Sequence, residues 1–204
     1  MRKELLTAVL CVATVAAVAP SLASATSIPA LPSGVDQAYL ADANGDPQNG
    51  SYTLTGPLTF TGAASTSCTN TAFDVDYFDD GTTAITGFSA SGCALPGFPS
   101  CPFSITPTGL PWGDRFGHDT SSSTYKDYIN VSFDFNYGAA APACPVSGVI
   151  PETGLLSPTV SVSGSALSAM FSGSASGAIS GPAGSMDLSG TITGAVPSGS
   201  QFVF

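Results

Sequence analysis

The stretch CTNTAFDVDYFDDGTTAITGFSASGC, residues 68–93, decides the fold. Its two end residues, Cys68 and Cys93, each lie twelve residues from the central Asp80-Gly81 step. Asp-Gly is typical of a tight hairpin turn. If the flanking runs pair as antiparallel strands, the two cysteines lie opposite each other. The stretch therefore predicts a strand, a turn, a second strand and a disulfide.

The register of this hairpin also predicts part of the core. Apolar residues alternate on both sides of the turn, and the symmetric register places Phe73 opposite Phe88 on one shared apolar face. The same register pairs Val75 with Thr86 and Tyr77 with Ala84. Simple alternation puts both cysteines on the opposite, more polar face, unless a bulge intervenes.

Similar alternation continues along the chain. The clearest strand runs from Ile129 to Tyr137 and predicts that Phe133 is buried. Other strands are expected around 52–60 and 101–108, and four more after Leu155. Trp112, which follows Leu110-Pro111, is expected to fill the core.

About ten short, mostly antiparallel strands separated by turns predict a single disulfide-stabilised β-sandwich or closed barrel. Two segments are expected to differ from this pattern: a short helical turn over Val35–Ala41 and a flexible run over Gly117–Ser123.

The N-terminus resembles a secretory signal peptide. Arg2 and Lys3 precede an apolar stretch, and Ala23-Ser24-Ala25 fits a cleavage site. We therefore predict three parts: a signal peptide over 1–25, an irregular segment over 26–50 and a β-domain over 51–204. The apolar stretch is short for a membrane span, so we expect no transmembrane helix after cleavage and a secreted or cell-surface protein.

Four cysteines remain after cleavage: Cys68, Cys93, Cys101 and Cys144. An even number in an exported chain predicts disulfides. The hairpin favours Cys68–Cys93, which leaves Cys101–Cys144, and a Cys93–Cys101 bond is the main alternative. A zinc site is disfavoured because the chain has one histidine and no C-x-x-C motif.

The charge is strongly one-sided, with a net charge of −10 and four basic residues in the whole chain. Beyond the predicted signal peptide only Arg115 and Lys126 remain, so binding along a nucleic-acid backbone is excluded. We expect Arg115 to pair with Asp114 or Asp119 and Lys126 to pair with Asp127, or each cation to pair with a neighbouring segment.

Two acidic groups are candidates for calcium. Asp42, Asn44 and Asp46 have the spacing of the first ligands of a calcium loop, but the twelfth position is a threonine. A second group, explained equally well by strand alternation and by the turn, consists of Asp74, Asp76, Asp79 and Asp80. We expect no bound metal and no cofactor, and keep these residues as calcium candidates.

No catalytic set emerges from the sequence. His118 and Asp119 precede three serines, but the chain has no G-x-S-x-G motif, and triads assemble from separated segments. We therefore expect a protein that is not an enzyme and a polar loop at this position.

One combination of motifs resembles a known family. It consists of the TLTG strand (53–56), the cysteines around the Asp-Gly hairpin, and Leu110-Pro111-Trp112. Over residues 51–112 the chain resembles small secreted bacterial β-proteins that include the alkane-oxidation protein activators and related uncharacterised actinobacterial proteins. The resemblance implies a role linked with biofilm matrix and growth on hydrocarbons, and no catalytic residues.

Together these observations predict a secreted, non-enzymatic, structural or adhesive protein with cell-surface or matrix components as partners. One alternative is a calcium- or ligand-binding extracellular β-module. Another is an outer-membrane β-barrel, suggested by the terminal Gln201-Phe202-Val203-Phe204.

Overall fold

The computed structural model describes residues 27–62, 65–98, 100–138, 147–182 and 184–204. These residues form fourteen β-strands and one short 3-10 helix, η1, at Gly173–Ser176. The all-β class is therefore confirmed, with more strands than expected. The strands are β1 (Val35–Gln37), β2 (Tyr39–Ala41), β3 (Gly50–Thr61), β4 (Thr66–Tyr77), β5 (Thr83–Ala94), β6 (Phe103–Pro107), β7 (Trp112–Asp119), β8 (Thr124–Tyr137), β9 (Gly148–Leu156), β10 (Thr159–Ser163), β11 (Ala166–Ser172), β12 (Gly177–Gly181), β13 (Gly184–Ala195) and β14 (Gln201–Val203).

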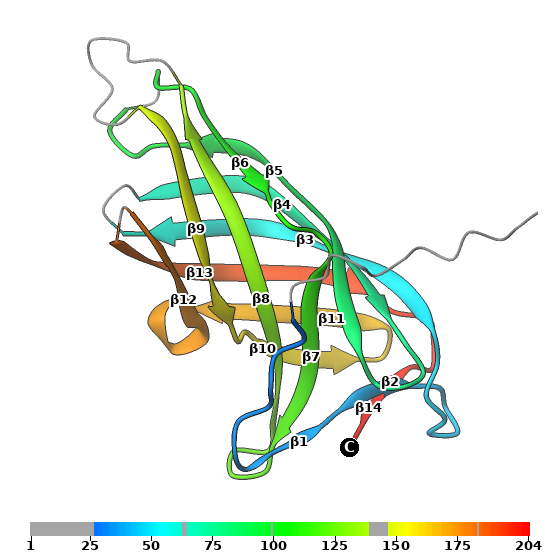
Figure 1. Ribbon diagram of the computed structural model, residues 1–204. Coiled ribbons are helices and arrows are strands. Elements are labelled where there is room, and N and C mark those ends of the chain that lie inside the picture. Colours follow the sequence, from blue (N-terminus) through cyan, green and yellow to red (C-terminus); the bar gives the residue numbers. More distant parts are fainter. Residues whose placement is uncertain (1–26, 63–64, 99, 139–146, 183) are drawn as a thin grey trace, which may run out of the picture.

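Twelve of these strands form one antiparallel sheet that closes on itself. Neighbouring strands run in the order β7-β5-β4-β3-β13-β11-β10-β8, and β8 pairs again with β7. A second connection runs from β8 through β9 and β12 to β13. Figure 1 shows β8 and β9 running steeply across β3, β4 and β13. The remaining strands, β2 and β14, form a separate two-stranded sheet.

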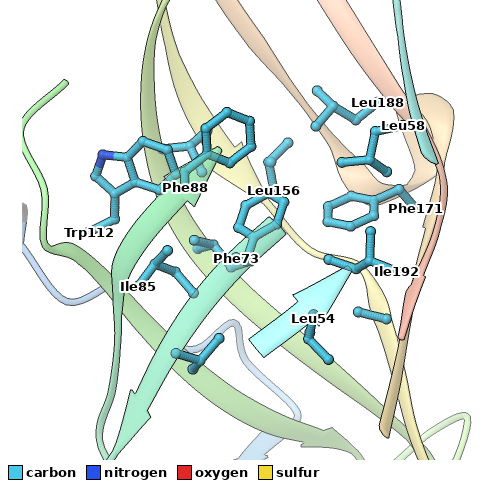
Figure 2. Packing of buried hydrophobic residues seen from close by; sticks show 14 of the residues in the cluster. Leu54, Leu58, Phe73, Ile85, Phe88, Trp112, Leu156, Phe171, Leu188 and Ile192 are labelled. Atoms are coloured by element: carbon cyan, nitrogen blue, oxygen red, sulfur yellow. The ribbon is translucent and has the colours of Figure 1, made fainter. Parts of the chain in front are cut away.

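The core consists of aromatic side chains in edge-to-face contact. The ring of Phe133 lies 4.9 Å from those of Phe88 and Trp112, and Phe73 lies 5.0 Å from Phe88. All four residues expected in the core are buried. Figure 2 shows Trp112, Phe88 and Phe73 clustered next to Leu156. The buried Trp112 indole donates a hydrogen bond of 2.7 Å to the Thr108 carbonyl oxygen.

The β4–β5 hairpin has the predicted register over most of its length. Phe73 faces Phe88 and Cys68 faces Cys93, as expected. The register shifts by one residue between Asp74 and Val75, so Val75 faces Ile85 instead of Thr86. The same shift places Thr83, not Ala84, opposite Tyr77. The physical reason is a bulge, because β5 carries one more residue than β4 near the turn.

The disulfide between Cys68 and Cys93 lies at the core, not on the polar face. Its S–S distance is 2.09 Å, and the Cys68 side chain is 1% exposed. Two consecutive exposed residues, Thr69 and Asn70, lie between the buried Cys68 and the buried Thr71 and shift the alternation by one position. On the partner strand β5, the alternation is also interrupted, because Ser91 and Gly92 are both exposed and Gly92 has a φ of 60°. The expectation from simple alternation is therefore wrong, and an irregularity in both strands is the reason.

Cys101 is also disulfide-bonded. The alternative Cys93–Cys101 bond is ruled out because Cys93 bonds Cys68. Cys144, the partner expected for Cys101, lies outside the described residues, as does the predicted signal peptide. In the part of the chain that is described, no helix is long and apolar enough to cross a membrane.

The segment 26–50 contributes strands to the structure. The helical turn predicted over Val35–Ala41 is wrong, since this segment forms β1 and β2. β1 pairs with the edge of β7, where a side chain on Gly117 would collide with Val35. This pairing also extends β7 to Asp119, so only the last part of the expected flexible run is a turn. Long-range pairing therefore decides the local structure here.

Candidate functional site

A groove of about 800 Å³ lies between β10 and the segment that leads into β14. Most of its lining residues are small or carry a hydroxyl, and none is charged. In a chain with a net charge of −10, this is a locally neutral surface. The lining residues are Ala43, Ser123, Thr124, Tyr125, Thr159, Val160, Ser161, Val162, Gly164, Ser165, Ser198, Gly199, Ser200, Gln201 and Phe202.

Aromatic contacts hold the β14 side of the groove against the main sheet. The Phe202 ring stacks on Tyr125 at 4.9 Å and meets the buried Phe116 ring at the same distance. Phe204 stacks on His118 at 3.8 Å. The terminal alternation of aromatic residues thus serves to fix β14 to β7 and β8, which places Gln201 and Phe202 at the groove.

The β10 side of the groove includes a strand edge that is only partly paired. β10 pairs with β11 along its whole length, from Thr159 to Ser163. On its other side it pairs with β8 at Thr159 and Val160 alone. Ser161 and Val162, which line the groove, therefore lie beyond the last position paired with β8.

Two aspartates, Asp119 and Asp42, lie next to residues that line the groove. Asp119 accepts hydrogen bonds from the Ser121 backbone N–H at 2.9 Å and from its hydroxyl at 2.6 Å. These bonds lower the pKa of Asp119 to about 2, and its partner in the β7–β8 register is the lining residue Thr124. Asp42 lies beside Ala43, and its main-chain carbonyl accepts a hydrogen bond from the Gln201 amide.

The first calcium candidate group forms a compact turn. The Asp42 carboxylate accepts hydrogen bonds from the backbone N–H groups of Asn44, at 2.8 Å, and Asp46, at 3.0 Å. The Asn44 amide donates to the same carboxylate at 3.2 Å. These bonds lower the pKa of Asp42. The carboxylate thus stabilises its own turn.

The second calcium candidate group is divided between a strand and a turn. Asp74 accepts a hydrogen bond from the Thr53 hydroxyl across the sheet, and Asp80 accepts bonds from the Thr82 hydroxyl and N–H within the turn. Asp76 lies on β4, and the Asp79 N–H donates to Asn49. Among the described residues, no three acidic, histidine or cysteine side chains gather as a metal site.

A polar group that the sequence analysis missed lies inside the sheet. Asp114 on β7 and Asp127 on β8 are buried, and their carboxyls interact. Thr83 lies opposite Asp114 in the β5–β7 register. Burial raises the pKa of both carboxyls, and the charge of Asp114 raises that of Asp127 further, so we infer that the pair retains a proton.

Two tyrosines extend this polar group. The rings of Tyr52 and Tyr77 lie 5.8 Å apart, and Tyr77 faces Thr83 across β4 and β5. Burial raises the pKa of the Tyr52 hydroxyl, and the charges of Asp127 and Asp114 add to this effect. We call Tyr52, Tyr77, Thr83, Asp114 and Asp127 the polar end of the interior.

The residues that resembled a hydrolase triad are not arranged as one. His118 is buried and stacks on Phe204, whereas the Ser121 hydroxyl donates to Asp119. The Ser122 hydroxyl lies 2.7 Å from that of Thr124. These contacts fit a structured polar turn between β7 and β8.

The expected pairing of each cation with its aspartate neighbour in sequence is wrong. Asp114 and Asp127 point into the interior, and successive residues of a strand point to opposite faces. Arg115 and Lys126 therefore lie on the outer face of β7 and β8. Period-two counting from Trp112 and Phe133 could have placed both aspartates inside.

No motif in the sequence predicted the groove. Its lining comes from four separate segments, and its serines and glycines also suit ordinary turns. No family model matches the chain, and no curated protein or solved structure shows significant similarity to it.

Proposed function

We propose that this protein is exported and acts outside the cell as a non-enzymatic, adhesive β-domain. The observation that carries the proposal is the neutral groove between β10 and β14, a hollow on the surface of a size that suits a binding site. Hydroxyls and aromatic rings line it, which suits contact with a neutral polymer or an extended chain.

The proposed location has two supports. Residues 1–25 have the pattern of a signal peptide, and Cys68 and Cys93 form a disulfide at the core. Disulfides of this kind persist in oxidising compartments, so export and the observed bond agree.

A non-enzymatic role is supported by where the reactive side chains lie. The interacting carboxyls of Asp114 and Asp127 are enclosed in the sheet, and His118 is stacked between rings. A substrate at the groove would therefore meet hydroxyls and backbone groups. The resemblance to alkane-oxidation protein activators stays a prediction and adds hydrophobic interfaces to the surfaces worth testing.

The test is adhesion of the purified protein to whole cells, insoluble matrix polymers and hydrocarbon droplets. Ser161→Trp places a large ring in the groove. Ser91→Trp, at an exposed position of β5 outside the groove, is the matched control. We expect Ser161→Trp to reduce the bound fraction at least tenfold and Ser91→Trp to leave it unchanged. Absence of binding to all three surfaces would overturn the proposal, and equal loss in both variants would remove the groove from it.

A further inference from the structure

We propose that the groove binds an extended peptide segment, which pairs through its backbone with the open edge of β10 at Val162. This inference rests on the proposed function and names the class of partner for the same site. The partner segment is neutral where it crosses the groove and carries lysine or arginine at its ends.

The hydrogen-bond pattern directs the backbone of Val162 toward the groove. The Pro158 carbonyl oxygen accepts a hydrogen bond from the Asp127 N–H, at 3.1 Å, on the β8 side. In an antiparallel strand, every second residue points both its N–H and its carbonyl to the same side. Val160 follows Pro158 in this series and pairs with Tyr125, and Val162 is the next member.

β8 has no strand residue to offer Val162. The register would place Ser123 opposite it, but Ser123 has a φ of 52° and lies in the turn that connects β7 and β8. The residue that would pair with Val162 therefore lies in this turn and not in β8. The groove occupies this position, so a strand lying in it would continue the path of β8 along β10.

Backbone pairing favours a peptide over a neutral glycan. An added strand satisfies the N–H and the carbonyl of Val162 together, as strand-addition sites in other proteins do. Small residues around this edge, such as Gly164 and Gly199, leave the backbone accessible. The stacked Tyr125 and Phe202 rings offer an apolar contact for alternate side chains of the added strand.

Charge selects the ends of the partner. The lining is uncharged, whereas Asp42 directly precedes the lining residue Ala43 and Asp119 pairs with the lining residue Thr124. Lys126, which pairs with the lining residue Thr159, lines a separate hollow together with Asp119. The whole chain has a net charge of −10. Basic residues that flank a neutral segment would meet these carboxylates, and acidic residues would be repelled.

The probe is a synthetic peptide of about eight alternating threonines and valines, with lysine at both ends. Its binding to the full folded domain is measured by calorimetry and by amide hydrogen exchange at Val162. Matched peptides carry glutamate ends, or a single backbone N-methyl group at one of two adjacent central positions. Cellohexaose serves as the neutral glycan probe.

We expect the lysine-ended peptide to bind and to slow exchange of the Val162 amide. One N-methyl position should weaken binding about tenfold, since it removes a hydrogen bond to β10, and the adjacent position should not. Glutamate ends should weaken binding several-fold at low salt, with less effect at high salt.

Val162→Pro removes the free N–H while leaving the β10–β11 pairing in place, so we expect a folded protein with peptide affinity reduced about tenfold. If this variant does not fold, the N-methyl pair gives the same answer with the unchanged protein. Equal effects of both N-methyl positions, or binding of cellohexaose alone, would overturn strand addition. Adhesion that is still lost in Ser161→Trp would in that case leave the proposed function standing.

Discussion

Two regions of the interior, the aromatic centre (Phe60, Phe88, Trp112 and Phe133) and the polar end, lie inside the same closed sheet, yet different interactions stabilise them. Around Phe133 the interior is a cluster of rings in edge-to-face contact. At the polar end, Asp114 and Asp127 occupy inward positions that an ordinary core fills with apolar side chains. The centre therefore depends on apolar burial, which is insensitive to pH, whereas the polar end depends on the state of a proton.

The difference also bears on where we propose that binding takes place. The aromatic centre is occupied by rings in contact with one another, and the residues of the polar end are buried. The groove lies instead where β8 stops pairing with β10, outside both regions. The sheet thus separates stability, which resides in its interior, from recognition, which we place at its edge.

The largest effect should come from the aromatic centre. Phe133→Ala removes a fully buried ring that contacts Phe60, Phe88 and Trp112. We expect a loss of about 3–5 kcal/mol in the free energy of unfolding, measured by urea denaturation. Phe98→Ala, at an exposed phenylalanine, should change it by less than about 0.5 kcal/mol. A small effect at Phe133 would mean that the centre is not the main source of stability.

The disulfide should have the next largest effect. Replacing Cys68 and Cys93 together by alanine removes a bond between residues 25 positions apart and leaves neither partner as a free thiol. We expect the free energy of unfolding to fall by about 3 kcal/mol, chiefly because the unfolded chain gains freedom. Mass spectrometry before and after reduction verifies the bond in the parent protein. A loss below about 1 kcal/mol would contradict this account.

The sequence predicted the interactions that repeat locally. Alternation around one turn was enough to place Phe73 opposite Phe88 and Cys68 opposite Cys93. The prediction from alternation was wrong where the register shifts. Neither the bulge between Asp74 and Val75 nor the change of phase at Thr69 and Asn70 can be recognised in the pattern of apolar residues. Local alternation therefore predicts which strands pair more reliably than it predicts the face of the sheet on which a residue lies.

Structure that depends on distant segments could not be predicted in this way. Val35–Gln37 becomes a strand because the edge of β7 accepts it, and the groove exists because β8 turns away at Ser123. Asp114 is a different case, since its position two residues after Trp112 already placed it on the inward face. Adjacency in sequence suggests a pair with Arg115, but strand alternation directs the Asp114 carboxyl to the opposite face of β7.

The third prediction concerns the proton of the polar end. Burial raises the folded-state pKa of Asp127, so its contribution to stability is fully present below the unfolded pKa of about 3.9 and is lost as pH rises through the folded pKa. Asp127→Asn keeps a neutral side chain of the same size at this buried position and has no proton to lose as the pH rises. We expect this variant to lose less stability than the parent between pH 5 and pH 9, by about 1 kcal/mol.

The control for this prediction is Asp134→Asn, which changes a carboxyl on the same strand, β8, at a position that is not enclosed. Thermal unfolding is followed across the pH range for all three proteins. A parent protein whose melting temperature does not fall as pH rises above 5 would show that the polar end holds no such proton.

The smallest effect should come from the surface, where the sign is reversed. Hydrogen bonds from Ser121 lower the folded-state pKa of Asp119 to about 2, so its contribution is present above the unfolded pKa and is lost as pH falls from about 4 toward 2. Asp119→Asn should therefore reduce the melting temperature slightly at pH 7 and not at pH 2. An NMR titration of the Asp119 carboxyl measures the pKa directly, and a value near 4 would mean that the turn does not hold the carboxylate. The two aspartates together separate the regions, because raising the pH weakens the enclosed polar end and strengthens the turn beside the groove.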